Sequence, residues 1–185
     1  QWTEPERLIL SNGYALDGAE FVFGDTMWFA SVRAGNYGEF DWYTTVRRNG
    51  VWRDWRNAGQ QINEQLKPGE LHISSDHRTM YYGKTGQYEG IDICMSERTE
   101  TGWGEPVNLG SLVNSAKDDM QPFLSSDGAE LWFTSWSDSF MGPCVYRCRK
   151  DSAGQWQRPG MIVGWFAGEP TLDDQQNLYF VHHYY

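Results

Sequence analysis

Four polar residues recur at matching places along the chain and could together bind a cation. Each lies just ahead of a short apolar stretch that leads into an aromatic triplet; they are Glu20, Glu70, Gln121 and Glu169. Three converging carboxylates repel one another unless a cation neutralises them or their pKa values rise. Ca²⁺, which takes roughly six to eight oxygen ligands, would suit such a site. The plainer interpretation is that these side chains bond to backbone amides and water, so no cofactor is required and Ca²⁺ is an option.

Catalysis has weaker support in the sequence. Glycoside hydrolysis needs two carboxyl groups ~5–9.5 Å apart on either side of a sugar, but the repeat alone explains the recurring glutamates. No His stands in a recognisable triad, and no phosphate-binding Gly loop is present. His182 and His183 are adjacent on an expected strand, so they point to opposite faces and cannot chelate one metal in the usual way. We therefore expect a protein that is not an enzyme.

Two loops with exposed aromatic residues are candidates for binding. Residues 33–38 and 85–90 each combine Gly with Tyr, and their side chains Asn36, Tyr37 and Tyr88 could contact a sugar or a protein at the rim of the fold. Rigid hairpins whose Tyr covers a sheet edge would explain the same pattern.

Composition narrows the class of protein. The chain has 185 residues, a formal charge of −10, and 10 Trp, 10 Tyr and 9 Phe. The acidic charge argues against nucleic acid and anionic membranes as partners, and no apolar run approaches the ~20 residues of a membrane span. Disordered chains are poor in aromatic residues, so we expect one folded domain over residues 1–185. The three Cys, at 94, 144 and 148, form no metal-ligand spacing and are expected to be buried apolar fillers.

Two motifs repeat with a period of about fifty residues. A Trp is followed three residues later by Pro or Trp, with Trp-to-Trp spacings of 50, 51 and 53; these Trp residues are Trp2, Trp52, Trp103 and Trp156. An apolar residue followed by two aromatics recurs out of phase with the first motif, at residues 27–29, 80–82, 131–133 and 178–180. Two independent markers with one period indicate a repeat architecture.

Each repeat unit has the pattern of four short strands. A short apolar stretch, a polar turn such as residues 125–128, the aromatic triplet, a Gly-containing loop and a third strand follow one another, and the Trp motif supplies a fourth strand at the edge, where Pro is tolerated. Four strands in roughly 40–50 residues is the blade of a β-propeller. The aromatic triplets are then expected to fill the space between neighbouring blades.

Residues 121–135, together with 90–93, 96–98 and 102–110, resemble the TolB-type, WD-like propeller repeat of bacterial envelope proteins. The resemblance extends over essentially the whole chain and implies an all-β propeller in an extracellular or periplasmic protein whose signal is absent or already removed. It says little about function, because such repeats serve as scaffolds in many settings. Ala129 stands where the sialidase Asp-box motif needs Gly, so a sialidase is not supported.

The strand order predicts four blades, over residues 17–62, 66–115, 118–164, and 167–185 with 1–12. The last blade is closed by the N-terminal strand and lacks one strand within this chain. Either the natural chain continues, or the N-terminal segment takes the missing place, or a strand from another copy completes the blade and builds a filament. Contacts for such assembly are expected from Trp2, Pro5, Leu8, Phe180, His182 and Tyr184.

The function expected from these features is a non-enzymatic scaffold for protein–protein interaction, with further copies of itself among its partners. A carbohydrate-binding propeller module is the alternative, and a glycoside hydrolase is the third choice.

Overall fold

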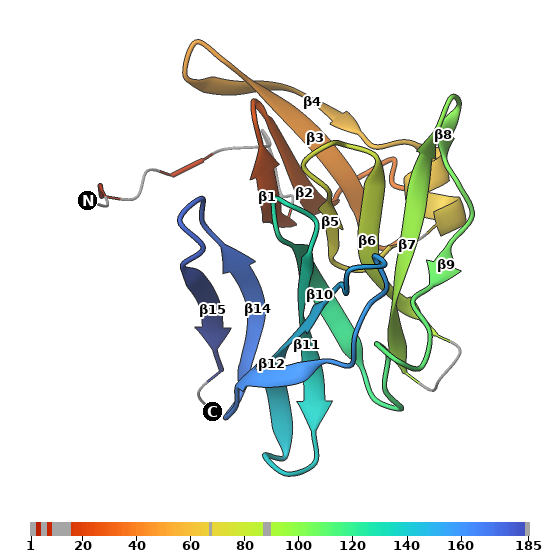
Figure 1. Cartoon of the computed structure of the whole chain (residues 1–185). Coiled ribbons are helices and arrows are strands. Elements are labelled where there is room, and N and C mark those ends of the chain that lie inside the picture. Colours follow the sequence, from red (N-terminus) through yellow and green to blue (C-terminus); the bar gives the residue numbers. More distant parts are fainter. Residues whose placement is uncertain (1–2, 5–6, 9–15, 67, 87–89, 184–185) are drawn as a thin grey trace. The chain divides into compact units, whose positions relative to one another are not determined.

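The computed structural model describes residues 3–4, 7–8, 16–66, 68–86 and 90–183, and the chain divides into two compact units, Gln1–Gln65 and Leu66–Tyr185 (Figure 1). Antiparallel strands dominate both units. Within the described ranges the one helical element is a single π-helical turn, η1 (Gln61–Leu66). The all-β class expected from the sequence is confirmed.

The first unit contains one four-stranded sheet, which we call the first sheet. Its strands pair in chain order; they are β1 (Leu16–Phe23), β2 (Thr26–Val32), β3 (Asp41–Arg48) and β4 (Val51–Asn57). The β3–β4 connection is the two-residue turn Asn49–Gly50, and both residues have positive φ, 51° and 78°. Asn-Gly favours this type of hairpin turn because its twist matches that of the flanking strands.

The second unit contains three further sheets. The second sheet consists of β5 (Leu71–Ile73), β6 (Thr79–Thr85), β7 (Ile91–Thr99), β8 (Gly102–Trp103) and β9 (Val107–Asn108). The third sheet consists of β10 (Asp119–Leu124), β11 (Glu130–Ser137), β12 (Gly142–Arg149) and β13 (Gly160–Val163). The last sheet consists of β14 (Ala167–Leu172) and β15 (Leu178–His182).

The outer strands of the second and third sheets begin later than the Trp motif predicts. β9 and β13 follow Pro106 and Pro159, whereas Trp103 lies in the short β8 and Trp156 in an isolated bridge to Lys150. Pro has no N–H to donate to a ladder, so the outer strand starts after it.

Closure of a ring by the N-terminal segment stays a prediction. Residues 1–2, 5–6 and 9–15 lie outside the described residues, and residues 3–4 and 7–8 belong to no strand. Likewise, the number of blades is not established by the sheets above, none of which is closed.

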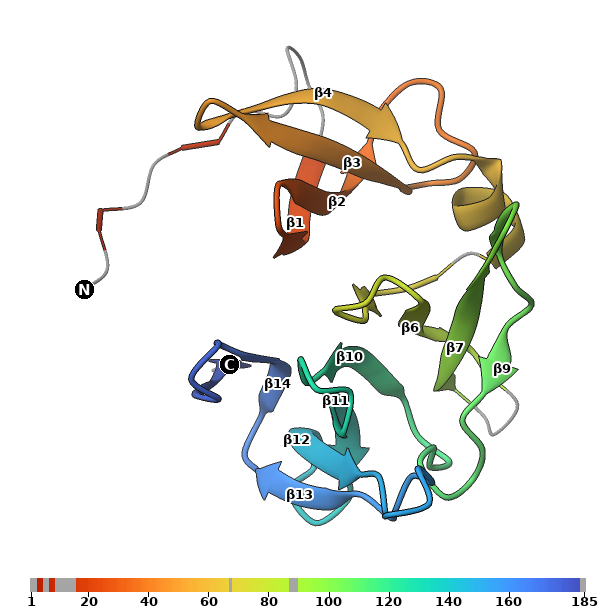
Figure 2. The same cartoon turned by 45° about the horizontal axis from the view of Figure 1, so that its top comes forward.

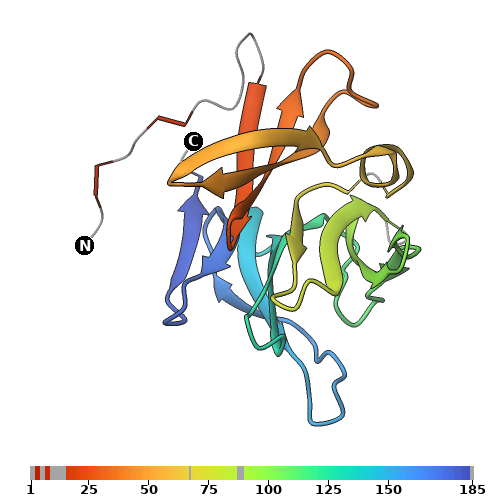
Figure 3. The same ribbon diagram turned by 90° about the horizontal axis from the view of Figure 1, so that it is seen from above.

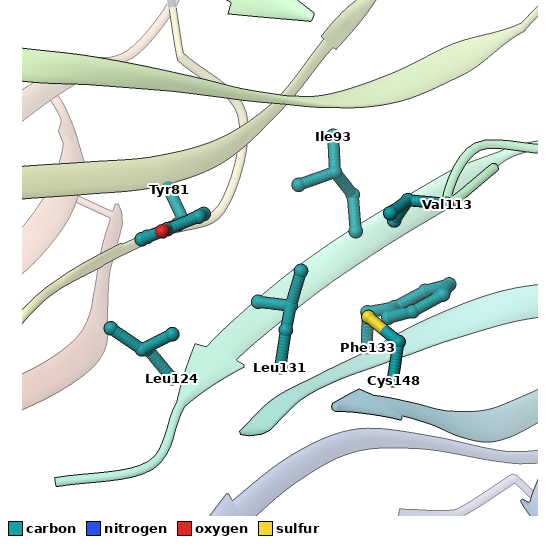
Figure 4. Close-up of a cluster of buried hydrophobic side chains, with 7 residues drawn as sticks. All are labelled: Tyr81, Ile93, Val113, Leu124, Leu131, Phe133 and Cys148. Carbon is teal, nitrogen blue, oxygen red and sulfur yellow. The ribbon is translucent and has the colours of Figure 1, made fainter. Parts of the chain in front are cut away.

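The core of the second unit lies between the second and third sheets. Figure 4 shows that side chains of the two sheets meet there, together with Val113 from the turn between β9 and β10; they are Tyr81, Ile93, Val113, Leu124, Leu131, Phe133 and Cys148. Every member is at most 5 % exposed, so the aromatic triplets of β6 and β11 fill the space between sheets as predicted. A second cluster joins the third sheet to β14 through Trp132, Val145 and Ala167. Figure 2 shows the third sheet between β14 and the second sheet.

All three cysteines are buried and free, as the sequence predicts. Burial raises the pKa of each thiol, that of Cys148 to about 12, because the thiolate loses its hydration inside the sheets.

The turns between the first two strands of each sheet in the second unit share an aspartate. Asp127 accepts a hydrogen bond from Ser125 Oγ at 2.6 Å and one from the Ala129 N–H at 3.0 Å, and Asp76 is held in the same way by Ser74 and Arg78. These bonds lower the pKa of both carboxyl groups. In addition, Ser75 Oγ donates to the Ser126 carbonyl at 2.7 Å, which links the turns of the second and third sheets.

Candidate functional site

Three of the four residues of the predicted cation site lie at bulges in the first strands of their sheets, and the fourth lies just ahead of such a strand. Gln121 and Glu169 have left-handed backbones, with φ of 56° and 54°, at points where the pairing register of β10 and β14 shifts. β1 shifts register between Ala19 and Phe21, the position of Glu20, whose side chain is not described. Glu70 directly precedes β5, and its carbonyl accepts a hydrogen bond from the Gly83 N–H at 3.2 Å. Glu20, Gln121 and Glu169 thus share a local irregularity of strand pairing that Glu70 lacks.

The side chain of Gln121 already accepts a hydrogen bond from the backbone. The Glu169 N–H donates to Thr134 Oγ1 at 2.9 Å and to Gln121 Oε1 at 3.3 Å, which is the backbone bonding that the plainer interpretation expects. Among the described residues, no group of three or more His, Cys, Asp or Glu side chains is placed to hold a metal ion. The Ca²⁺ site stays a prediction, since the side chain of Glu20 is outside this description.

A pair of asparagines, one of them buried, and a buried aspartate hold the outer loops of the first and second sheets. In the second sheet, Asn114 accepts from the Ile93 N–H at 2.9 Å and donates to the Ile93 carbonyl at 3.0 Å. Asn108 donates to Asp92 at 2.7 Å and accepts from Asn114 at 2.9 Å. We call this set of Asp, Asn sixteen residues later and Asn six residues after that the asparagine clamp. The first sheet repeats it with Asp41, Asn57 and Asn63.

Two buried aspartates, Asp41 of the clamp and Asp119 outside it, accept hydrogen bonds from neighbouring loop amides. Asp41 is fully buried and accepts from the Tyr37 and Gly38 N–H groups at 3.0 and 3.2 Å. Asp119 is also buried and accepts from the Ser115 N–H at 2.6 Å. Burial raises the pKa of Asp119, and the nearby charge of Asp92 adds to the rise. Because these carboxyl groups are enclosed and accept loop N–H bonds, they hold the loops in place.

The loop at residues 33–38 places its two candidate binding residues differently. Asn36 donates to the Ser31 carbonyl at 2.7 Å and accepts from Tyr43 Oη at 2.8 Å, so its amide is used within the loop. The Tyr37 side chain is 51 % exposed and remains available. Arg33 packs over the rings of Tyr43 and Trp55, each at 4.6 Å, which stiffens the base of the loop. Tyr88 lies outside the described residues.

β15 differs from its counterparts in solvent exposure. Tyr179 and Phe180 of its triplet and the following Val181 are 41, 40 and 42 % exposed, whereas Tyr82 of β6 and Phe133 of β11 are 0 and 1 % exposed. Successive residues of a strand point to opposite faces, so both faces of β15 are accessible over these three residues. Figure 3 shows the β14–β15 hairpin.

The turn end of the hairpin that carries β15 is held by hydrogen bonds and by apolar packing. Asp173 accepts from the Asn177 N–H and Nδ2 groups, each at 2.8 Å, and from Tyr179 Oη at 3.2 Å. Leu172 and Leu178 pack against the cluster formed by Trp132, Val145 and Ala167. Among the described residues β15 pairs with β14 alone, so it is the edge of its sheet.

Of the six assembly residues expected from the sequence, three are described by the structure and three are not. Phe180 and His182 belong to β15, and Leu8, 42 % exposed, lies in no strand. Trp2, Pro5 and Tyr184 lie outside the described residues.

Sequence reasoning missed a group of exposed aromatic residues at the end of the third sheet. Trp136 and Trp165 are 45 and 67 % exposed, and the Phe140 ring meets that of Trp165 edge-on at 5.3 Å. Trp165 and Phe166, two of the three residues that connect β13 to β14, both have φ of 61°. Gly142 and Gly164 lie against the rings of Phe166 and Phe140, and these two glycines were the available signal.

No family model and no curated protein matches the chain. Several solved structures, in contrast, are similar to the chain. An endo-arabinase from Bacteroides thetaiotaomicron is 13 % identical with a TM-score of 0.53, over 86 % of this chain and 66 % of that one. TolB from Acinetobacter baumannii is 18 % identical with a TM-score of 0.52, over 86 % of this chain and 35 % of that one. The chain thus spans less than two thirds of either protein.

At these identities the likeness concerns the fold. The antiparallel sheets with strands in chain order and the match to these two structures support a propeller-like β fold. The similarity to TolB agrees with the resemblance found in the repeats without establishing membership of its family. No helix among the described residues is long and apolar enough to span a membrane.

Proposed function

We propose that the protein is a non-enzymatic, extracellular or periplasmic β-propeller scaffold that binds protein by accepting an added β-strand on β15. The observation that carries this proposal is the exposure of residues 179–181, at 40–42 %, at a repeat position that is almost fully buried in the second and third sheets. A strand that keeps its apolar residues accessible at a sheet edge is a template for pairing with another chain. The simplest partner is a further copy of the protein.

Charge on the added-strand site should break this association. Val181→Lys places an ammonium group where a partner strand would cover it, and we expect self-association to weaken at least about tenfold, since burying an unpaired charge is costly. Val107→Lys is the matched control, because Val107 is also a strand valine, 52 % exposed, in the same unit. Sedimentation velocity over a wide concentration range measures both variants against the native chain.

Two results would overturn the proposal. One is a native chain that stays a single species at the highest concentration. The other is association that Val181→Lys and Val107→Lys alter equally.

Carbohydrate binding is the second candidate, favoured by the exposed Tyr37 ring on its stiffened loop. A Tyr ring can pack against an apolar face of a ligand while its hydroxyl group forms a hydrogen bond at the solvent-exposed edge. A glycan array that detects a ligand for the native chain and loses it with Tyr37→Ala would establish this function. Retention of the same signal by Tyr37→Ala would remove the loop as its site.

A further inference from the structure

The hairpin formed by β3 and β4 carries a local excess of positive charge in an acidic chain (Figure 1). Residues 47–56, at its turn end and along β4, include four Arg and a single Asp, a formal charge of +3, whereas the whole chain has −10. All of these residues are exposed except Trp52, which is half-buried. We call residues 47–56 the basic hairpin. A local field of this sign attracts anionic groups although the chain as a whole repels them.

The register of the hairpin places three of its four Arg on one face. Positions 44, 46 and 48 of β3 share a face because side chains alternate along a strand. β4 pairs Arg56, Arg53 and Val51 with these positions in that order. Residues directly opposite one another lie on the same face, so Arg48, Arg53 and Arg56 form a row, which we call the arginine row. Its successive members are two β3 positions apart, a step of ~7 Å.

A bulge in β4 aligns this row. In a regular strand, residues 53 and 56 would point to opposite faces because they are three positions apart. The pairing shifts between Thr44 and Val46, and Asp54 has a left-handed backbone with φ of 57°. One extra residue therefore enters β4 and returns Arg56 to the face of Arg53. Like charges aligned on one face destabilise a sheet, and a bound anion would offset that effect.

The guanidinium groups of the row are available to a partner. Among the residues that the structure describes, Arg53 and Arg56 form no ion pair, and Arg48 has a long contact with Asp54 at 3.6 Å. A guanidinium pairs with a carboxylate through two parallel hydrogen bonds. In an extended peptide, alternate side chains lie ~7 Å apart on one face, which is the step of the row. Carboxylates at alternate positions of such a peptide therefore match the three Arg.

The aromatic rings of the basic hairpin argue against nucleic acid as the partner. Trp52 lies opposite Arg47, whose guanidinium is 6.0 Å from its ring centre, so this pair is on the face away from the row. Trp55 packs edge-on against Tyr43 at 5.9 Å, and Arg33 covers it at 4.6 Å. Single-stranded nucleic acid binds by stacking bases on open rings beside a basic groove. Here the rings and the arginine row are on different faces, so a ligand that offers carboxylates fits better.

We propose that the arginine row binds an extended acidic segment of a partner protein, with carboxylate groups at alternate positions. This surface belongs to the first sheet, so the inference goes beyond strand addition to β15 and does not depend on it.

Two synthetic peptides test the matched spacing. The probe is a fluorescently labelled ten-residue peptide that alternates Glu and Thr, and the control has five Glu followed by five Thr, with the same composition and charge. Anisotropy measurements with the full chain should show the alternating peptide binding at least about fivefold more tightly. Its affinity should fall as NaCl is added, because salt screens exposed ion pairs. Equal affinity of the two peptides overturns the matched spacing.

Substitutions locate the site on the chain. Arg53→Glu should weaken binding of the alternating peptide at least about tenfold, because repulsion replaces a paired contact. Arg158→Glu is the matched control, since Arg158 is an exposed Arg of the second unit and the net charge changes equally. It should leave binding within about twofold of the native value. Arg53→Lys keeps the charge but loses the two-pronged contact, so it should weaken binding by about two- to threefold.

Competitors of other chemistry complete the test. Heparin and a ten-nucleotide oligothymidylate should displace the labelled peptide only at higher concentrations of negative charge than the unlabelled peptide needs. Displacement by either at a lower concentration overturns the acidic segment as occupant. Equal weakening by Arg53→Glu and Arg158→Glu overturns the row as the site, and no binding of the peptide at low salt overturns the inference altogether. Because none of these results involves Val181→Lys, each leaves the strand site on β15 to be judged by its own measurements.

Discussion

The third and last sheets use the same aromatic triplet in opposite ways. In the third sheet Trp132 and Phe133 are 6 and 1 % exposed, between strands on both sides and sheets on both faces. In the last sheet Tyr179 and Phe180 are 41 and 40 % exposed. The chemistry of the motif is unchanged, so the difference comes from its neighbours. The same residues stabilise a fold where they are covered and provide a binding surface where they are not.

The largest expected effect comes from truncating the equivalent aromatic in each sheet. Phe133→Ala should lower the free energy of unfolding by about 3–5 kcal/mol, because it leaves a cavity in the buried cluster. Phe180→Ala should cost about 0.5 kcal/mol, as is usual for exposed positions. Urea denaturation followed by Trp fluorescence measures both. Equal losses of stability would show that Phe180 is packed as well as Phe133. The proposed difference between the last and third sheets would then not hold.

The asparagine clamp should be the next most sensitive element, and the third and last sheets show no such clamp among the described residues. Asn114→Ala removes its bonds to Ile93 and Asn108 and leaves buried backbone groups unsatisfied, at a cost of about 3 kcal/mol. Asn63→Ala, its counterpart in the first sheet, should cost a similar amount. Thermal unfolding of both variants tests this, and a loss below about 1 kcal/mol in either would make the clamp dispensable.

Acid should loosen the contact of the third sheet with β5 before it affects the turn of the last sheet. Burial lowers the pKa of His72 to about 4, and its ring packs on Phe123 at 4.5 Å. The unfolded chain binds this proton below its ordinary pKa, so stability is lost as the pH falls from about 6.5 to about 4. Allowing for partial exposure, the loss is about 2 kcal/mol.

The turn of the last sheet, at residues 173–177, should respond to acid at a lower pH than His72 does. Hydrogen bonds from Asn177 lower the pKa of Asp173, so its stabilising effect is present above the ordinary carboxyl pKa and disappears only below it. Hydrogen exchange at pH 7, 5 and 3 should show early opening around β5 and late opening around residues 173–177. His72→Gln should abolish the early phase, and an unchanged early phase would assign it to another group.

The smallest change in stability is expected at the connection between the third sheet and the last sheet, which contains Trp165. Trp165→Asn relaxes a left-handed backbone that Asn tolerates but loses the contact with Phe140, so the net change should stay below about 1 kcal/mol. Trp132→Asn, at 6 % exposure, should cost several times more. Comparable losses in a thermal melt would mean that Trp165 contributes to the core.

The strands were predictable because their signal is local. Triplets such as residues 131–133, polar turns and Pro positions repeat within each unit, and the same pattern placed Glu169 and Gln121 at equivalent sites. The clamp was not predictable from local pattern, because Asn114 bonds a residue 21 positions away. The exposed Trp165 was missed for a related reason. A large aromatic in a repeat rich in aromatics is expected to be core, and only the shortness of its loop turns it outward.

The three buried thiols have a practical consequence for the strand site. Because Cys94, Cys144 and Cys148 are enclosed and their pKa values are raised, they should react slowly with alkylating reagents at neutral pH. A cysteine introduced at position 181 would then be the fast-reacting group, without prior removal of the native ones. A partner strand that pairs with β15 would cover this cysteine. The rate at which the cysteine is alkylated would then fall, and this fall would report the pairing.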